Sequence, residues 1–342
     1  MKKVLLFFIS LAVGSALLFA VVQKTGWEDV KSVFLSFSGW DGLIILGLSV
    51  LMMIVGNWRW REVLKGQGIN IPFFPLLEIY FAGFFVMFLA PIIFFGGETL
   101  RAYLIRKKYS VSWDQGVASV VVDRMVELTV YVAVILAGVS YFVFSTGFNF
   151  SGFNLVLGSV LALFVAGIFL FYSKCFKKQS ILKFFAGIFK PELNDGKPFE
   201  LEQEFFKVLK PTGKFFWRIV MLSFLRCGIM LARSWALLFF FGKAIGFFPA
   251  VSVLSFSYLA QMIPIPTALG VHETFQALVF SVLGIGSFMA PVFAMIIRGG
   301  DLLMALIGMV FLFHFGFYLA KDVLFKKIEA FANGRNHKNG QP

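Results

Sequence analysis

The sequence predicts an all-α polytopic membrane protein that consists of an inverted repeat, with six full spans and two re-entrant helical hairpins. Of its 342 residues, 59% are hydrophobic and only 14% are charged, and the mean hydropathy is +0.86. Soluble domains carry about 25% charged residues, so this composition excludes that class. Six apolar stretches have about the 20 residues that an α-helix needs to cross the hydrocarbon core. They are residues 4–22, 42–58, 116–145, 153–172, 219–242 and 291–319.

The charged termini and loops predict the orientation. Residues 4–22 follow "MKK" as in a signal peptide, but no small-residue cleavage site follows them, so we expect a retained first helix. Cytoplasmic loops hold the Lys and Arg excess, and with the amino terminus inside, the outside segments carry only Lys24, Lys31 and Lys243. The net charge of +13 therefore indicates topology, with both termini cytoplasmic in the cytoplasmic membrane, and does not indicate a nucleic-acid partner.

Two further apolar runs, residues 73–97 and 247–289, are interrupted by Pro and Gly. A full crossing by the first run would place "RAYLIRKK" and the lysine-rich loop 174–214 outside. We therefore expect a hairpin that enters and leaves on the cytoplasmic side, with its break near Pro91 and Gly96-Gly97. Non-helical backbone at membrane depth occurs only where protein or a watery cavity covers it, so the hairpin should line a cavity.

The two broken runs share a pattern around a glutamate. Pro91 precedes Glu98 by seven residues in "PIIFFGGE", and Pro266 precedes Glu273 by seven in "PTALGVHE". A threonine follows each glutamate. The matching spacing predicts that the two runs are copies of one element.

Arginines at matching distances extend this repeat in both directions. Arg59 lies 39 residues before the first glutamate, and Arg233 lies 40 before the second. Arg124 follows the first glutamate by 26 residues, and Arg298 follows the second by 25. Each late arginine has an acid three residues on, which places the pair on one helical face; these acids are Glu127 and Asp301.

The predicted topology makes the repeat inverted, because corresponding helices cross in opposite directions. The first repeat is residues 1–150. The second begins with a helix at 151–173 and continues at 215–320, after a cytoplasmic basic loop at 174–214, and a cytoplasmic tail follows at 321–342. Inverted repeats with broken helices at matching positions are typical of secondary transporters, which bind substrate near the midplane.

The basic loop contains "ILKFFAGIFK", whose apolar residues have helical spacing beside lysines, as in an interfacial helix. Two interpretations remain open for this loop. It rests on anionic headgroups, or it docks a separate lipid-modifying enzyme.

Buried charges form the candidate substrate site, since Arg and Glu are costly within spans. A guanidinium binds phosphate oxygens through two parallel hydrogen bonds, and carboxylates accept amines, hydroxyls or protons. We expect the principal phosphate ligands to be Arg124 and Arg298. The whole predicted substrate-binding set is Arg59, Glu98, Arg124, Glu127, Arg233, Glu273, Arg298 and Asp301.

Several of these residues also have a purely structural interpretation. Arg59, between two tryptophans, has the pattern of a snorkelling interfacial side chain. Arg124, Arg233 and Arg298 have the alternative of structural ion pairs with nearby acids.

Four more residues are possible members of the site. Arg101 is expected at the interface, beside the basic cluster, and Asp123 is a candidate ion-pair acid. Arg226 shares a helical face with Arg233, so it extends the polar track or caps the cytoplasmic end. His272 relays protons or is a hydrogen-bonded structural residue.

Four segments carry a resemblance to a known family: "GNWRWREVL", "GGETLRAYL", "DRMVEL" and "PIPTALGVHE". Here the sequence resembles the lysylphosphatidylglycerol synthase transmembrane-region family, a flippase-like membrane domain. The resemblance implies movement of lipids across the bilayer. Members that synthesise aminoacyl lipids carry a large soluble domain after the membrane region, which we do not expect here, and Thr267 and Ala268 stand where the family often has a Gly pair.

The function favoured by these features is a lipid flippase for a phospholipid or a polyprenyl-linked phosphate. The alternative is a membrane glycosyltransferase or related enzyme acting on a polyprenyl-phosphate lipid. The sequence has no metal-ligand cluster and no D-x-D pair on a cytoplasmic loop, so we expect no metal and no cofactor. A scaffold protein would leave the buried charges unexplained.

Overall fold

A computed structural model describes residues 28, 39–89, 96–147, 153–177, 180, 197–209, 213–263 and 270–338. This described part consists of ten helices and contains no strand, which confirms the all-α class. Four helices are long and apolar enough to cross a membrane. They are α3 (Gly39–Gly66), α6 (Trp113–Thr146), α10 (Lys214–Phe240) and the Met289–Gly316 part of α13 (Met289–Lys338).

Two of the remaining predictions concern the first helix of each proposed repeat. The stretch 153–172 lies within α7 (Phe153–Phe176). The stretch 4–22 lies outside the described residues, as does "ILKFFAGIFK". Within the basic loop the structure has a helix that the sequence analysis missed, α9 (Lys197–Val208), which packs mainly on α6. Its apolar residues are few and stand between charged ones, so no long apolar run marked it.

Each broken run forms two helices. The first comprises α4 (Phe73–Leu89) and α5 (Gly97–Tyr109), and the second comprises α11 (Phe247–Met262) and α12 (Val271–Val282). Of the expected break near Pro91 and Gly96-Gly97, Pro91 lies outside the described residues, whereas Gly96 directly precedes α5 and Gly97 begins it. Helix α12 starts after Gly270, whose φ of 76° lies in the left-handed region that favours glycine.

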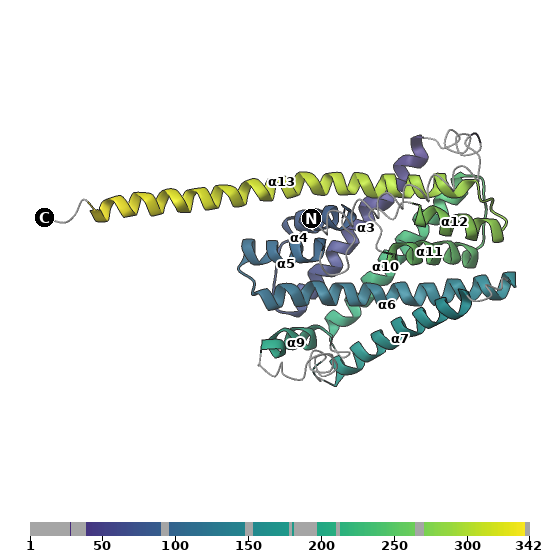
Figure 1. Cartoon of the computed structure of the whole chain (residues 1–342), viewed down its shortest axis with the longest axis horizontal. Helices are drawn as coiled ribbons and strands as arrows, with labels where there is room; N and C mark the ends of the chain where they lie inside the picture. The colour runs from purple at the N-terminus through teal and green to yellow at the C-terminus, as the bar shows by residue number, and fades with distance from the viewer. Residues whose placement is uncertain are drawn as a thin grey trace.

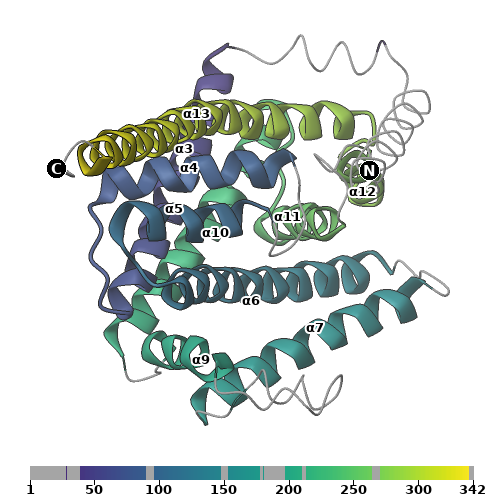
Figure 2. The same ribbon diagram turned by 60° about the vertical axis from the view of Figure 1, so that its left-hand side comes forward.

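The helices pack in three extensive pairs, which Figures 1 and 2 show from two directions. Helix α3 lies against α10, α4 lies along α13, and α11 lies along α6. The backbones of α4 and α13 come close at Gly308, where a Cβ would overlap the carbonyl of Phe81. On the other side, Ser255 of α11 donates a hydrogen bond to the carbonyl of Val134 in α6, at 2.7 Å. These pairs enclose the buried polar residues described below.

The start of α5 is positioned by glycines. A Cβ at Gly97 would overlap the backbone of Gly83 in α4, so only glycine permits this approach of the two helices. A capping box then fixes the start of α6, because Ser112 accepts from the backbone N–H of Gln115 and the Gln115 side chain accepts from that of Ser112. Together these local features position α5 against α4 and fix where α6 begins.

Helix α13 continues far beyond the predicted span. It runs for 50 residues to Lys338, and its C-terminal part projects past the other helices in Figure 1. The predicted end at residue 319 marks the end of the apolar stretch. The helix continues there because the next residues include many good helix formers and no proline.

Candidate functional site

One face of α6 carries the centre of the candidate site. Asp123, Glu127 and Tyr131 follow one another at four-residue spacing, so they lie along one face of the helix, with Arg124 beside them. The side chain of Asp123 is fully buried and that of Glu127 is 2% exposed. Buried carboxylates require counter-charges, and four arginines from α3, α5, α6 and α10 supply them.

Asp123 binds two arginines. Its Oδ1 lies 2.7 Å from Nε of Arg59, and its Oδ2 lies 3.0 Å from Nη2 of Arg101. The Arg101 guanidinium also lies over the rings of Trp60 and Tyr80, with centroid distances of 4.0 and 4.7 Å. The interfacial position expected for Arg101 is therefore wrong. The side chain is 3% exposed because α5 packs on both α4 and α6, which turns it inward between them.

Arg59 is buried as well, which contradicts the snorkelling interpretation. Its side chain is 1% exposed, and besides Asp123 it reaches Glu127, with 3.4 Å between Nη2 and Oε2. The neighbouring Trp60 is also fully buried, and its indole N–H donates to Ser119 of α6 at 3.1 Å. Of the two tryptophans that flank Arg59, only Trp58 is exposed.

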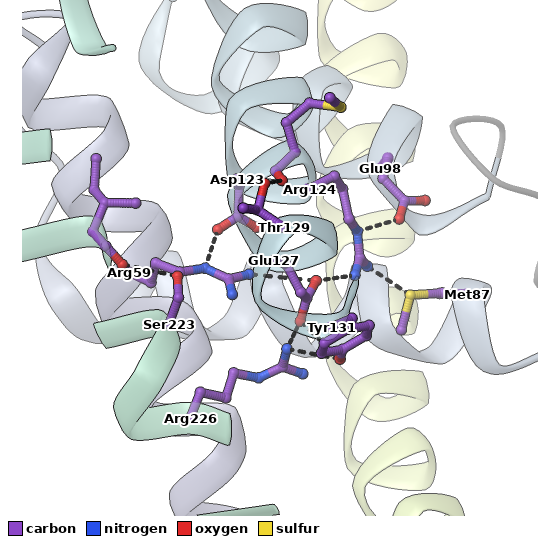
Figure 3. Close-up of polar contacts among 12 residues, drawn as sticks. Arg59, Met87, Glu98, Asp123, Arg124, Glu127, Thr129, Tyr131, Ser223 and Arg226 are labelled. Atoms are coloured by element: carbon purple, nitrogen blue, oxygen red, sulfur yellow. Dashed lines mark hydrogen bonds and ion pairs between the residues drawn. The ribbon is translucent and has the colours of Figure 1, made fainter. Parts of the chain in front are cut away.

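Glu127 is the hub of the cluster. Figure 3 shows arginines pointing toward its carboxylate from three sides. Arg124 approaches to 2.5 Å, Arg226 forms a second close ion pair, and the hydroxyl of Tyr131 donates to Oε1 at 3.2 Å. Arg226 therefore extends the polar track.

Arg124 connects Glu127 to helix α5. Its Nε lies 2.6 Å from Oε1 of Glu98, the glutamate in the first turn of α5, while its Nη1 contacts Glu127. One guanidinium thus bridges two carboxylates from different helices. The arrangement joins Glu98, Arg124 and Glu127, three residues of the predicted set (Figure 3).

The second half contributes Arg233 and Asp301. Nη1 of Arg233 lies 2.7 Å from Oδ1 of Asp301 and donates to the hydroxyl of Ser49 in α3 at 3.0 Å. This contact links α10, α13 and α3. Arg124 and Arg233 thus each form an ion pair with a nearby acid, as their structural interpretation predicts.

Three other predicted residues lie apart from these ion pairs. Glu273 is fully buried and His272 is 3% exposed, and Arg298 is half-buried. Among the described contacts, both carboxylate oxygens of Glu273, Nδ1 of His272, and Nε and Nη1 of Arg298 have no hydrogen-bond partner. Glu98 and Glu273, both members of the predicted substrate-binding set, therefore differ in their surroundings.

A cavity of about 190 Å³ lies beside the cluster. It receives charged side chains from both halves of the chain and is otherwise mainly apolar. Glu273, Arg298 and Arg59 do not line it. The charged lining residues are three acids and three arginines, namely Glu98, Glu127, Asp301, Arg124, Arg226 and Arg233.

The arginines and acids of the ion pairs above, together with Glu273 and Arg298, do not balance in number. We call the following eleven residues the charged cluster: Arg59, Arg101, Arg124, Arg226, Arg233, Arg298, Glu98, Asp123, Glu127, Glu273 and Asp301. With every group ionised, six arginines face five acids, so one positive charge is in excess. Such a site favours an anionic ligand, since an anion supplies the missing counter-charge.

Comparison with known proteins identifies the chain. The sequence model of the lysylphosphatidylglycerol synthase TM region matches residues 7–308. The chain belongs to this family. Among curated relatives, a UPF0104 membrane protein of Methanocaldococcus jannaschii is 22% identical over 287 residues, which cover 81% of this chain and 85% of the relative. A UPF0104 membrane protein of Pyrococcus horikoshii is 25% identical over 323 residues, covering 87% and 92%.

Sequence analysis missed the uncharged lining of the cavity in this family member. Tyr131 stacks on Tyr258 of α11, with ring centroids 4.0 Å apart, and the two rings form part of the cavity wall. The position of Tyr131, four residues after Glu127, was a usable signal. No local sequence pattern indicated that Tyr258 or the methionines would line the cavity. The methionines of the lining are Met52, Met87, Met230 and Met262.

The part of the chain that the structure describes contains no group of three His, Cys, Asp or Glu side chains arranged to hold a metal ion. The side chains that line the cavity supply arginine, carboxylate and tyrosine groups. These groups bind anions and polar hydroxyls and exchange protons.

Proposed function

We propose that this protein is a lipid transporter that moves a phosphate-bearing lipid, a phospholipid or a polyprenyl-linked phosphate, across the membrane. The observation that carries the proposal is the cavity beside the charged cluster. Arg124, Arg226 and Arg233 line it together with acids and large apolar side chains. A mixed lining of this kind suits a polar headgroup whose tails stay in lipid.

The arginines are the phosphate ligands in this proposal. Guanidinium groups remain charged in the membrane and match phosphate oxygens through paired hydrogen bonds. Arg298 does not line the cavity, so Arg233 takes the role of phosphate ligand in the second half. The excess positive charge of the charged cluster supports an anionic headgroup, and the three lining acids receive its amine or hydroxyl groups.

The size of the cavity supports transport of a headgroup alone. Pockets that enclose whole drug-sized ligands measure about 300–1,000 Å³. The observed volume of about 190 Å³ accommodates a phosphate and a small substituent but no acyl chain. The headgroup would cross through the protein while the tails follow in the bilayer.

An inverted repeat with six spans and two re-entrant hairpins is the architecture that we propose for this activity. The packing of the described helices supports it. Helix α4 of the first half lies along α13 of the second, and α11 of the second half lies along α6 of the first, as a twofold exchange requires. Helices α3 and α10, the corresponding second helices, lie against each other.

Individual side chains support the same correspondence. Ser49 and Ser223 each lie ten residues before the early arginine of their half, and each hydroxyl donates to the carbonyl four residues back at 2.8 Å. Two residues after each early arginine, Arg61 and Trp235 each donate to a carbonyl ten residues further on, at 3.0 Å. Matching contacts at matching positions are expected of duplicated halves.

Reconstitution into liposomes tests the proposal. We would follow transbilayer movement of acyl-labelled phosphatidylglycerol, read by an external quencher, and of a polyprenyl phosphate, read by an external phosphatase. Movement should be faster than in protein-free liposomes and should be lost in Arg124→Gln. The matched control is Arg106→Gln, because Arg106 is exposed on α5, outside the cavity lining.

Equal rates in proteoliposomes and protein-free liposomes for both lipids would reject the transporter proposal. Chemical conversion of either lipid, read by mass spectrometry, would favour the enzyme alternative.

A further inference from the structure

Glu273 is a buried acid that lacks the ion pair of its counterpart in the other half. Glu98 lies 2.6 Å from Nε of Arg124. Glu273 is fully buried, yet none of the ion pairs among the described residues includes it, and neither of its carboxylate oxygens has a hydrogen-bond partner of normal geometry there. The two glutamates thus occupy different electrostatic states within one structure.

Among the described residues, one nearby cation acts on Glu273. Arg298 of α13 acts on the carboxylate through its electrostatic field, and the backbone N–H groups of Gly270 and Glu273 itself lie close by. Nε and Nη1 of Arg298 also lack hydrogen-bond partners among the described residues. The acid and the arginine therefore interact electrostatically without forming an ion pair.

The other described titratable groups near α12 are His272, Arg233 and Tyr258. His272 is buried beside Glu273, with Arg298 and Arg233 as its nearest charges. Arg233 is paired with Asp301. Helix α11 carries no charged residue between Phe247 and Met262, and its one tyrosine, Tyr258, contacts sulfur atoms of α10.

Burial of a carboxylate without a direct ion pair favours its protonated form. An ionised carboxylate in this position loses several kcal/mol of solvation, which Arg298 and the nearby backbone N–H groups offset only in part, and protonation removes the charge. Intramembrane acids of this kind commonly serve in proton pathways.

We propose that Glu273 is a proton-binding site and that proton binding there strengthens binding of the anionic headgroup in the cavity. The second part rests on the proposed function. One proton from water adds to a carboxylate oxygen, and no other bond changes. The charge of ionised Glu273 offsets that of Arg298, whereas protonated Glu273 leaves Arg298 with Asp301 alone as counter-charge, and Asp301 is already paired with Arg233.

The geometry of α13 links this change to the cavity. Arg298 and Asp301 lie three residues apart on one face of the helix, and Asp301 lines the cavity. Protonation raises the excess positive charge of the charged cluster from one to two, and a phosphate offsets it. By linkage, the proton and the headgroup then increase each other's affinity by the same factor.

A binding titration tests the coupling. We would titrate the full chain in detergent with short-chain phosphatidylglycerol, whose phosphodiester keeps one negative charge, at mildly acidic and mildly alkaline pH. The wild type should bind at least about fivefold more tightly at acidic pH. Glu273→Gln resembles the protonated acid, so it should bind at both pH values with the affinity that the wild type has at acidic pH.

Two controls separate Glu273 from its neighbours. His272→Gln should keep the pH dependence, because it leaves the Glu273 carboxyl unchanged. Phosphatidylcholine of the same chain length, which carries no net charge, should show a smaller pH effect than phosphatidylglycerol. A pH dependence that is lost in His272→Gln and kept in Glu273→Gln would overturn the assignment.

Infrared difference spectroscopy tests the proton site without any lipid. The wild type should show the band of a protonated carboxyl that disappears on alkaline titration, and Glu273→Gln should lack this band. Removal of the nearby cation in Arg298→Gln should move the titration to higher pH. Absence of the band from the wild type, or its persistence in Glu273→Gln, would refute the proton site.

The binding titration and the infrared experiment distinguish failure of the proton coupling from failure of the transporter proposal. If phosphatidylglycerol binds equally at both pH values, the coupling fails while the transporter proposal stands. If the lipid binds at neither pH and the band is present, the proton site stands and the proposed anionic headgroup is wrong.

Discussion

Arg101 and Asp123 form a buried ion pair, with 3.0 Å between Nη2 and Oδ2. It is the one ion pair of Arg101 among the described residues, whereas Asp123 also binds Arg59. At the corresponding positions of the proposed second repeat stand Gln276 and Ile297, which are two uncharged residues in place of the charge pair. This relationship allows a test of whether the pair acts as a unit.

We expect Asp123→Ile alone to destabilise the protein by about 3–5 kcal/mol, because it leaves Arg101 buried and unpaired. Adding Arg101→Gln should recover part of this loss, because it removes the unpaired charge and restores the combination seen in the second half. Thermal unfolding of the two single variants and the double variant in detergent measures the coupling. Strictly additive losses would show that the two residues act independently.

Arg124→Lys should impair lipid movement by about tenfold or more in the liposome assay while the protein remains folded. The Arg124 guanidinium contacts Glu98 through Nε and Glu127 through Nη1, and a single ammonium lacks this fork. Arg106→Lys, at an exposed position of α5, is the matched control and should transport as the wild type does. Wild-type rates in Arg124→Lys would remove Arg124 from the substrate site.

Gly97→Ala should weaken the packing of α5 on α4, because the added Cβ would overlap the backbone of Gly83. Overpacking of this kind costs about 1–3 kcal/mol. Gly47→Ala is the control, since Gly47 lies in helix α3 with open space around its Cα. There the substitution should be neutral or stabilise by up to about 1 kcal/mol. Equal melting temperatures of the two variants would contradict the close approach of α4 and α5.

Cysteine labelling tests the orientation. Lys24→Cys and Phe148→Cys should react with a membrane-impermeant maleimide from outside, and Lys108→Cys and Lys197→Cys should not. The two native cysteines, Cys175 and Cys227, are buried and would first be replaced by serine. Labelling of position 108 from outside would exclude the re-entrant hairpin at 73–97 and, with it, the inverted repeat.

Hydropathy alone determined the membrane class and most helices of this protein. The four candidate spans fall on the apolar stretches 42–58, 116–145, 219–242 and 291–319. These predictions succeed because the cost of placing a residue in hydrocarbon depends mainly on that residue and adds up along a segment. Hydropathy did not predict helix α9, because this helix is stabilised by packing on α6.

Because charged residues are rare within spans, the sequence also predicted most members of the charged cluster, including Glu98, Arg124 and Glu127. Tertiary structure decided which arginine meets which acid. Arg59 reaches Asp123 across 64 residues of sequence. Arg101 turns inward, and Arg298 stays outside the cavity lining. These outcomes depend on how each helix is rotated and where it crosses its neighbours, which side-chain packing between distant segments sets and no local stretch of sequence encodes.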